Sequence, residues 1–312
     1  MSEGPRLPLL LEDPSIHTVT LALNYVCNSR CSFCFIEPEL DMRLPDTSDE
    51  HVAAVFEENR RRQRYERLIL AGAEATLRKD LPDIARRALA EGGFRVVRLQ
   101  TNGRRLKDAN YARQLVDAGI SEFFVSVHAG RAELDRKLTR NPNSFAEMSA
   151  GLDNLRGLTV RLMSNTCVSA SNVDDLDALA TFLIDHGVPE SHFWGFIEFG
   201  DIGQQAEHVA FARAVPATLA AARRLLAQGN QVVLSWFPRC MLEDLQHLLI
   251  DHRDDTLIHE SFSSRAKAHG GFSCAHSASC ARFQRGCMGL HERHVELIGD
   301  EAHLLRPLAA GE

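Results

Sequence analysis

The chain has 312 residues, of which 45% are hydrophobic and 25% charged, and its formal net charge is −7. These values are typical of an ordinary globular protein with one large and one small domain, and the acidic balance argues against a nucleic-acid partner. No apolar run has the length of a membrane span or the pattern of a signal peptide. We therefore expect a cytoplasmic protein without a membrane contact. In such a protein, its eight cysteines are expected to be metal ligands rather than disulfides.

Strand and helix patterns alternate along the chain after an irregular N-terminal lead-in at residues 1–17. Each apolar run is followed, after a short connection, by a segment with helical start or stop signals such as a polar cap or a terminal glycine. The predicted strands are 19–25, 67–71, 94–99, 123–128, 159–168 and 192–198, and the predicted helices are 49–63, 81–91, 107–118, 144–155, 173–186 and 206–228.

Six strand–helix repeats with short connections are typical of parallel βαβ units. They are too few for a closed eight-fold barrel, so the pattern leaves a partial barrel or a doubly wound open sheet. Polar residues at the predicted strand ends favour the barrel, because barrel active sites are built there. The composition changes near residue 230, which predicts a main domain at 18–230 and a small C-terminal domain at 231–312 that starts with one more strand.

Three cysteines, Cys27, Cys31 and Cys34, follow the first predicted strand with the spacing C-x3-C-x2-C. Thiolates bind soft metals tightly, but a structural zinc site requires four protein ligands. Three ligands in one tight loop suit a [4Fe-4S] cluster that keeps one iron open for a small molecule. The alternative is a loop of three reduced cysteines without a metal.

This motif, with Phe33 before its last cysteine, resembles that of the radical S-adenosylmethionine (radical SAM) superfamily. The resemblance implies an α/β fold with a partial (β/α)6 TIM-like barrel. It also implies that the open iron binds S-adenosylmethionine (SAM), which one electron cleaves to methionine and a 5′-deoxyadenosyl radical. The cofactor carries that chemistry, and the protein orients it.

Further matches follow the next strands. Gly72, Ala73 and Glu74 stand where members of the superfamily usually carry Gly-Gly-Glu-Pro, although Ala73 and the following alanine depart from that pattern. A methyl group at this position is compatible with a backbone contact only if φ is not positive. The resemblance and the predicted strand faces imply a set of cofactor contacts: Phe33, Gly72, Ala73, Glu74, Thr101, Asn102, Ser126, Arg161 and Asn165.

Two residues are candidates for direct roles with the substrate. His128 shares a strand face with Ser126 and is either an acid–base or substrate contact or a satisfied structural histidine. Glu198 ends the sixth predicted strand and either binds ribose or substrate or forms a surface salt bridge. On the fifth strand, alternation places Arg161, Met163, Asn165 and Cys167 on one largely polar face, where Cys167 is expected to be a small buried filler.

Four late cysteines, Cys240, Cys274, Cys280 and Cys287, form a complete set of ligands. They suit an Fe–S cluster or a zinc site, although the paired C-x2-C knuckles of zinc ribbons are missing; free thiols are the third alternative. The region resembles the twitch or SPASM-like extensions of radical SAM enzymes, which implies one auxiliary [4Fe-4S] cluster. We expect the nearby His276, His291 and His294 at the surface.

The resemblance implies a radical SAM oxidoreductase that abstracts a substrate hydrogen atom and uses the auxiliary cluster in an oxidative modification, with a ribosomal peptide as the first expectation for the substrate. The expected partners are an external electron donor, such as flavodoxin or ferredoxin, and a separate leader-peptide-binding protein, because the sequence shows no N-terminal domain for that role. The alternative within enzymes is dehydrogenation or rearrangement of a sugar or amino-acid derivative. The alternative outside enzymes is a non-catalytic, metal-binding redox sensor.

Overall fold

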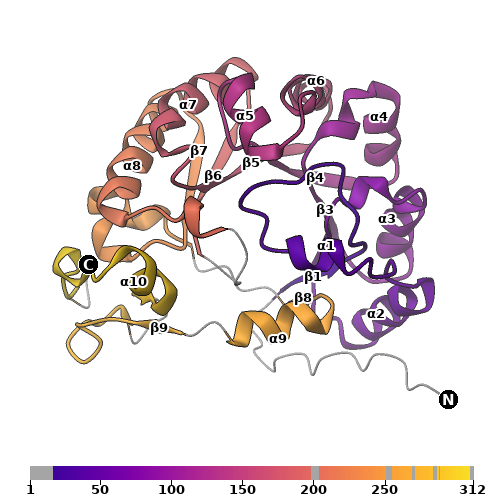
Figure 1. Cartoon of the computed structure of the whole chain (residues 1–312). Coiled ribbons are helices and arrows are strands. Elements are labelled where there is room, and N and C mark those ends of the chain that lie inside the picture. The colour runs from indigo at the N-terminus through magenta and orange to yellow at the C-terminus, as the bar shows by residue number, and fades with distance from the viewer. Residues whose placement is uncertain are drawn as a thin grey trace.

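A computed structural model describes residues 17–197, 204–250, 255–268, 271–283, 287 and 289–309. Its main sheet has eight strands in the order β7-β6-β5-β4-β3-β2-β1-β8, and every neighbouring pair is parallel. The sheet curls into an open half-barrel with an arc of helices on its outer face (Figure 1). The strands are β1 (Thr18–Ala22), β2 (Arg67–Ala71), β3 (Val96–Thr101), β4 (Ile120–Ser126), β5 (Arg161–Val168), β6 (Glu190–Gly195), β7 (Gln231–Ser235) and β8 (Asp255–Leu257).

The outer helices follow the strands in chain order, as parallel crossovers require. Ser48 caps the first long helix through a hydrogen bond from the His51 backbone N–H to its hydroxyl. The helices are α1 (Glu37–Asp41), α2 (Asp49–Arg62), α3 (Leu81–Ala90), α4 (Ala109–Asp117), α5 (Ala132–Thr139), α6 (Ser144–Arg156), α7 (Leu176–Asp185) and α8 (Phe211–Ala227). Within the described residues, no helix is both long and apolar enough to cross a bilayer.

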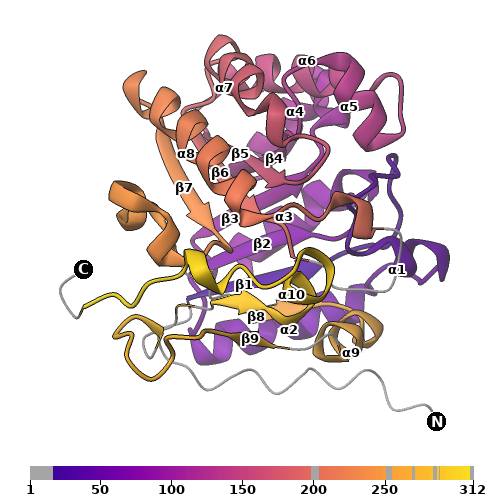
Figure 2. The same cartoon turned by 60° about the vertical axis from the view of Figure 1, so that its left-hand side comes forward.

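The C-terminal part lies on the open side of the curled sheet. It contains α9 (Glu260–Ala268), a two-stranded antiparallel sheet of β9 (Phe272–Ser273) and β10 (Leu290–His291), and α10 (Glu292–Ile298). Figures 1 and 2 show these elements beside the concave face that the outer helices leave uncovered. The C-terminal elements therefore lie on the concave side of the sheet, opposite the outer helices.

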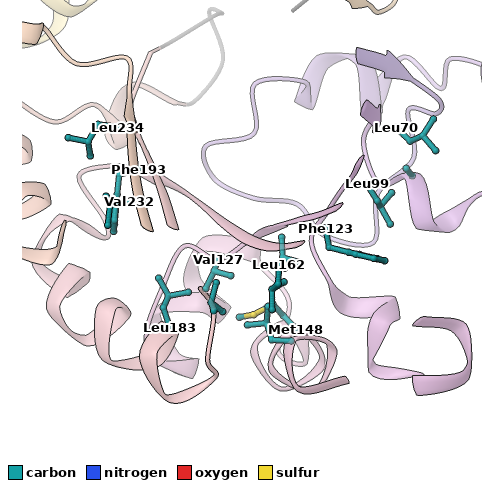
Figure 3. Packing of buried hydrophobic residues seen from close by; sticks show 14 of the residues in the cluster. Leu70, Leu99, Phe123, Val127, Met148, Leu162, Leu183, Phe193, Val232 and Leu234 are labelled. Atoms are coloured by element: carbon teal, nitrogen blue, oxygen red, sulfur yellow. The ribbon is translucent and has the colours of Figure 1, made fainter. Parts of the chain in front are cut away.

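The apolar core lies between the convex face of the sheet and the helices. Alternate strand residues such as Leu99, Phe123 and Phe193 point outward and are fully buried, and Leu162 meets Met148 of α6 there (Figure 3). The intervening residues point into the lumen of the half-barrel. This division explains why the strands are apolar on one face and partly polar on the other.

The element predictions differ from the structure at several elements. Helix α5 has no predicted counterpart, and β8 adds a strand beside β1. Helix α8 begins at Phe211 rather than at 206, and it continues through Pro216. The predicted boundary near residue 230 stays a prediction, but β7 and β8, which follow it, both pair within the barrel sheet.

Phe123→Ala is expected to lower the free energy of unfolding by about 3–5 kcal/mol, because the ring is fully buried between β4 and the helices and its loss leaves a cavity. Chemical denaturation followed by circular dichroism would measure the change. Phe35→Ala is the matched control, since that ring is 42% exposed. Equal losses in both variants would contradict the packing described here.

Candidate active site

The loop with Cys27, Cys31 and Cys34 leaves the carboxyl end of β1 and is held from two sides. The Arg104 guanidinium, only 9% exposed, donates to the backbone carbonyl of Asn28 and to the Ser29 hydroxyl. On the other side, the backbone N–H groups of Arg30 and Ser32 donate to carbonyls at the end of α5, at 3.1 and 2.8 Å. The loop is therefore anchored between β3 and α5 at the mouth of the half-barrel.

The three thiols lie close enough together to influence one another. Burial, followed by the charges of Cys34 and Cys27, raises the pKa of the Cys31 thiol well above its ordinary value. Burial also raises the pKa of Cys34 to about 12. The Ser29 backbone N–H points at the Cys27 sulfur at 3.4 Å. Three half-buried sulfurs that share one loop suit ligation by a positively charged iron centre.

The turn after β2 shows why only one of its two small residues must be glycine. Gly72 has a φ of +135°, and a Cβ on it would lie 2.7 Å from the Asn24 backbone oxygen. Ala73 is not among the described residues with positive φ, and its backbone N–H donates to the Asn24 carbonyl at 2.9 Å. The departure at Ala73 is thus compatible with a backbone contact at this turn.

Glu74 and Thr101 bind each other instead of facing the mouth. The buried Glu74 carboxylate accepts from the Thr76 hydroxyl, from the Thr101 hydroxyl at 2.6 Å and from the backbone N–H of Asn102 at 2.7 Å. These side chains hold the turns after β2 and β3 together; the prediction of Glu74 and Thr101 as cofactor-binding residues stays a prediction. The Asn102 side chain points at the cysteine loop, where its amide donates to the Asn28 side chain at 2.6 Å.

Ser126 and Asn165 are paired neighbours on β4 and β5, and both face the lumen. Asn165 is 6% exposed, and its side-chain oxygen is buried without a hydrogen-bond partner in the described part of the molecule. A buried acceptor without a partner is costly. It therefore suits a ligand that brings an N–H or O–H donor, as the ammonium and ribose groups of SAM do.

His128 lies two residues beyond β4, against the cysteine loop. Its ring packs edge-on against Phe33, with centroids 4.5 Å apart, and its Nδ1 accepts from the backbone N–H of Cys167 at 3.2 Å. Burial lowers the pKa of His128 to about 4, so the ring is neutral at pH 7. This neutral ring packs on Phe33, and Phe33 in turn lies in a small apolar cluster with Cys31 and Cys167.

Arg161 is separated from these residues. It begins β5, at the opposite end from the cysteine loop, and its guanidinium pairs with Glu190 at 2.8 Å and with Glu122 at 3.3 Å. Glu122 also binds Arg67 and Arg98, so the cluster closes the floor of the lumen. Alternation gave the face of Arg161 correctly, but its position at the start of β5 places it in an ion-pair network; its cofactor contact stays a prediction.

Glu198, the other candidate for a direct role with the substrate, lies outside the described residues.

His128→Ala is expected to keep SAM cleavage and to lower coupled product about tenfold to a hundredfold, because a reactive carbon must be held in close alignment. Simultaneous assays of 5′-deoxyadenosine and product would measure how much SAM cleavage is coupled to product formation. His128→Phe is the matched variant, because it keeps an aromatic ring against Phe33 and removes the nitrogens. Full recovery of coupled product in His128→Phe would contradict a substrate contact and assign the ring to packing.

Of the four late cysteines, Cys240, Cys274 and Cys287 lie close enough for their charges to interact. Cys240 lies in a short turn (Arg239–Met241) directly after β7, and its pKa is raised by burial and by the charges of Cys287 and Cys274. The backbone N–H of His276 points at the Cys274 sulfur, and that of Leu308 at the Cys280 sulfur, each at 3.4 Å.

The environment of Cys280 favours its thiolate. Burial alone would raise its pKa, but the backbone N–H groups of Leu308, Phe283 and Arg282 lower it. Among the described residues, no three His, Cys, Asp or Glu side chains converge as one metal ion requires. Four thiolates can ligate either an Fe–S cluster or a zinc ion.

Two of the three neighbouring histidines are not at the surface. His291 is 6% exposed and His294 is 2% exposed, which overturns their prediction as surface residues. The Nε2 of His294 lies 2.7 Å from the Glu301 carboxylate, and that carboxylate accepts two backbone N–H groups at the start of α8. These contacts join the C-terminal elements to the barrel.

Sequence reasoning missed three polar residues that shape the site. Arg104 and Glu207 bind the cysteine loop. Asn172, fully buried, donates to the backbone carbonyls of His128 and Cys167 and so joins the ends of β4 and β5. Each acts on a segment far away in the chain, so no local spacing identifies it; the only signal was a polar residue type near a strand end.

Comparison with known proteins agrees with this geometry. The sequence model of the radical SAM superfamily matches residues 22–183, about half of the chain. The GTP 3′,8-cyclase of Aquifex aeolicus (strain VF5) is 28% identical over 196 residues, covering 60% of this chain and 58% of the relative. The chain thus spans less than two thirds of the length of this curated relative.

Two solved structures share the fold at low sequence identity. Streptococcus suis SuiB bound to S-adenosylmethionine has a TM-score of 0.61 at 10% identity, covering 94% of this chain and 76% of that one. Native anSMEcpe with bound AdoMet and a Kp18Cys peptide has a TM-score of 0.59 at 13% identity, covering 72% of this chain and 65% of that one. These likenesses support the partial-barrel architecture.

Proposed function

Because the chain belongs to the radical SAM superfamily, we propose that Cys27, Cys31 and Cys34 hold a [4Fe-4S] cluster and that the lumen above β4 and β5 binds SAM. When bound, this cluster supplies the electron that cleaves SAM to methionine and a 5′-deoxyadenosyl radical. The chain's own groups orient the reactants: Ser126 and the partnerless oxygen of Asn165 accept donors from SAM, and Phe33 forms the adjoining wall.

We also propose that Cys240, Cys274, Cys280 and Cys287 hold an auxiliary [4Fe-4S] cluster. When bound, it supplies an acceptor for the electron left after a hydrogen atom is removed from substrate carbon. One observation supports this two-site arrangement most: the first cysteine loop follows β1 and Cys240 follows β7, and the carboxyl ends of both parallel strands open at the same mouth. A substrate in the mouth would lie between the two groups.

For the substrate we propose a peptide that undergoes oxidative modification. The open concave side and the structural likeness to a protein solved with a bound peptide support this class. An external flavodoxin- or ferredoxin-type donor would supply electrons, and a separate protein would bind the leader peptide. The second candidate is a small molecule of nucleotide type, which the sequence similarity to a GTP 3′,8-cyclase favours.

Anaerobic reconstitution would test both the proposed clusters and the proposed substrate. We expect about eight irons per chain and 5′-deoxyadenosine after reduction in the presence of SAM. One assay offers peptides encoded by neighbouring genes as the substrate, and a parallel assay offers GTP. Mass spectrometry identifies the product of each. A peptide that loses two hydrogens supports the first candidate, whereas conversion of GTP alone replaces it with the second. Tightly bound zinc without 5′-deoxyadenosine would support the redox-sensor alternative.

A further inference from the structure

Glu207 is a buried carboxylate that bridges the cysteine loop and the end of β5. Its side chain accepts the Ser32 hydroxyl at 2.5 Å on Oε1 and the Ser169 hydroxyl at 2.8 Å on Oε2, and Ser171 adds a third donor on Oε1 at 3.1 Å. The residue is 5% exposed. Its backbone carbonyl also accepts from the Ala170 N–H at 2.9 Å.

The environment of the Glu207 carboxylate is unusual because hydroxyl groups, and not cations, stabilise its charge. In the described residues, no Lys or Arg forms an ion pair with Glu207, whereas the buried Glu122 and Glu190 each bind arginine. Burying a carboxylate costs free energy unless strong hydrogen bonds compensate it, and O–H···O⁻ bonds of about 2.5–2.7 Å are among the strongest available. The carboxylate therefore orders the hydroxyls that point at it.

Ser32 is the partner with a functional position. It lies between Cys31 and Cys34, and its backbone N–H is already held by the Leu138 carbonyl at 2.8 Å. The Glu207 contact fixes the side chain of the same residue from the opposite side of the mouth. The segment between the second and third thiols is thus fixed through both backbone and side chain.

The residue after Glu207 extends this bridge toward the C-terminal elements. The His208 ring lies 5.1 Å from Phe196 and 5.8 Å from His294, and His294 binds the Glu301 carboxylate. The short turn at Gln204–Glu207 therefore joins the cysteine loop to the part of the chain that carries the late cysteines.

We propose that Glu207 is a positioning residue of the SAM-cleaving site, which acts through the Ser32 hydroxyl to fix the spacing of Cys31 and Cys34. This inference rests on the proposed cluster at those cysteines. Glu207 touches neither thiol in a hydrogen bond that the structure describes; its effect passes through Ser32. Replacing Glu207 should therefore alter how SAM binds to the cluster and leave the fold of the barrel intact.

Glu207→Gln tests the inference, because it keeps the size and removes the charge that orders three hydroxyls. In the reconstituted full chain reduced with dithionite, we expect retained iron, a weakened change of the electron paramagnetic resonance spectrum on SAM addition, and 5′-deoxyadenosine formation about tenfold to a hundredfold slower. Ser32→Ala should reproduce these changes and guards against misfolding, since it deletes one hydroxyl from a partly exposed loop residue. The double variant should be no worse than either single one.

Ser171→Ala is the matched control, because its hydroxyl binds the same Oε1 from the β5 side without touching the cysteine loop. It should leave the spectrum and the rate within about twofold of wild type. Wild-type behaviour of Glu207→Gln, or additive losses in the double variant, would overturn the positioning role. A wild-type protein that assembles no cluster would overturn the proposed function itself, so the two failures are distinguishable.

Discussion

Replacing Cys27, Cys31 and Cys34 together with alanine is expected to abolish 5′-deoxyadenosine formation completely. The three sulfurs share one anchored loop, the charges of Cys34 and Cys27 help to raise the pKa of Cys31, and Cys27 accepts a backbone N–H. Without these ligands, SAM has no iron to bind, and the polar lumen groups alone cannot deliver an electron. The triple variant should also lose about four irons per chain, measured by iron and sulfide analysis after anaerobic reconstitution.

Cys167→Ala provides the matched control for that variant. Cys167 packs in the same small cluster as Cys31, Phe33 and Ala129, but burial raises the pKa of its thiol to about 12 and its place on β5 assigns it to packing. It should keep both the iron content and the SAM cleavage of the wild type. Cleavage that persists in the triple variant would overturn the assignment of the first cluster and, with it, the proposed reaction.

The parts of the site that follow from strand order could be predicted from the sequence. Parallel strands with short crossovers bring all carboxyl ends to one mouth, so Cys27, Ser126, His128 and Asn165 could be grouped without coordinates. Period-two alternation also gave the lumen face of β5 correctly. These inferences depend only on backbone geometry, which the hydrophobic pattern determines.

Other features could not be predicted, because they depend on partners far away in the chain. The Ser32–Glu207 contact spans 175 residues, and the carboxylate looks like an ordinary charged residue in its local sequence. Arg161 shows a second limit: alternation gives the face of a strand residue but not its distance from the mouth. His291 and His294 seemed typical of a polar surface, yet tertiary packing buries them.

The second large effect is expected from replacing Cys274, Cys280 and Cys287 with alanine. This variant should lose about four of roughly eight irons, retain SAM cleavage, and form no detectable coupled product. The physical reason is that these cysteines are proposed to hold a separate cluster, which contributes to the fate of the substrate electron rather than to cleavage. In a single preparation of this variant, the iron content should fall and the coupled product should disappear, whereas 5′-deoxyadenosine should still form.

Stability provides an independent readout of the same variant. Backbone N–H groups of His276 and Leu308 point at two of these sulfurs, so the fold of this region is arranged around thiolates, and ligand binding should be coupled to its folding. We expect faster proteolysis after residue 257 in the variant and little change in Ser279→Ala, the control at the exposed position beside Cys280. Intact protein with bound zinc and only about four irons would refute the auxiliary cluster, because the same sulfurs would then serve a structural metal.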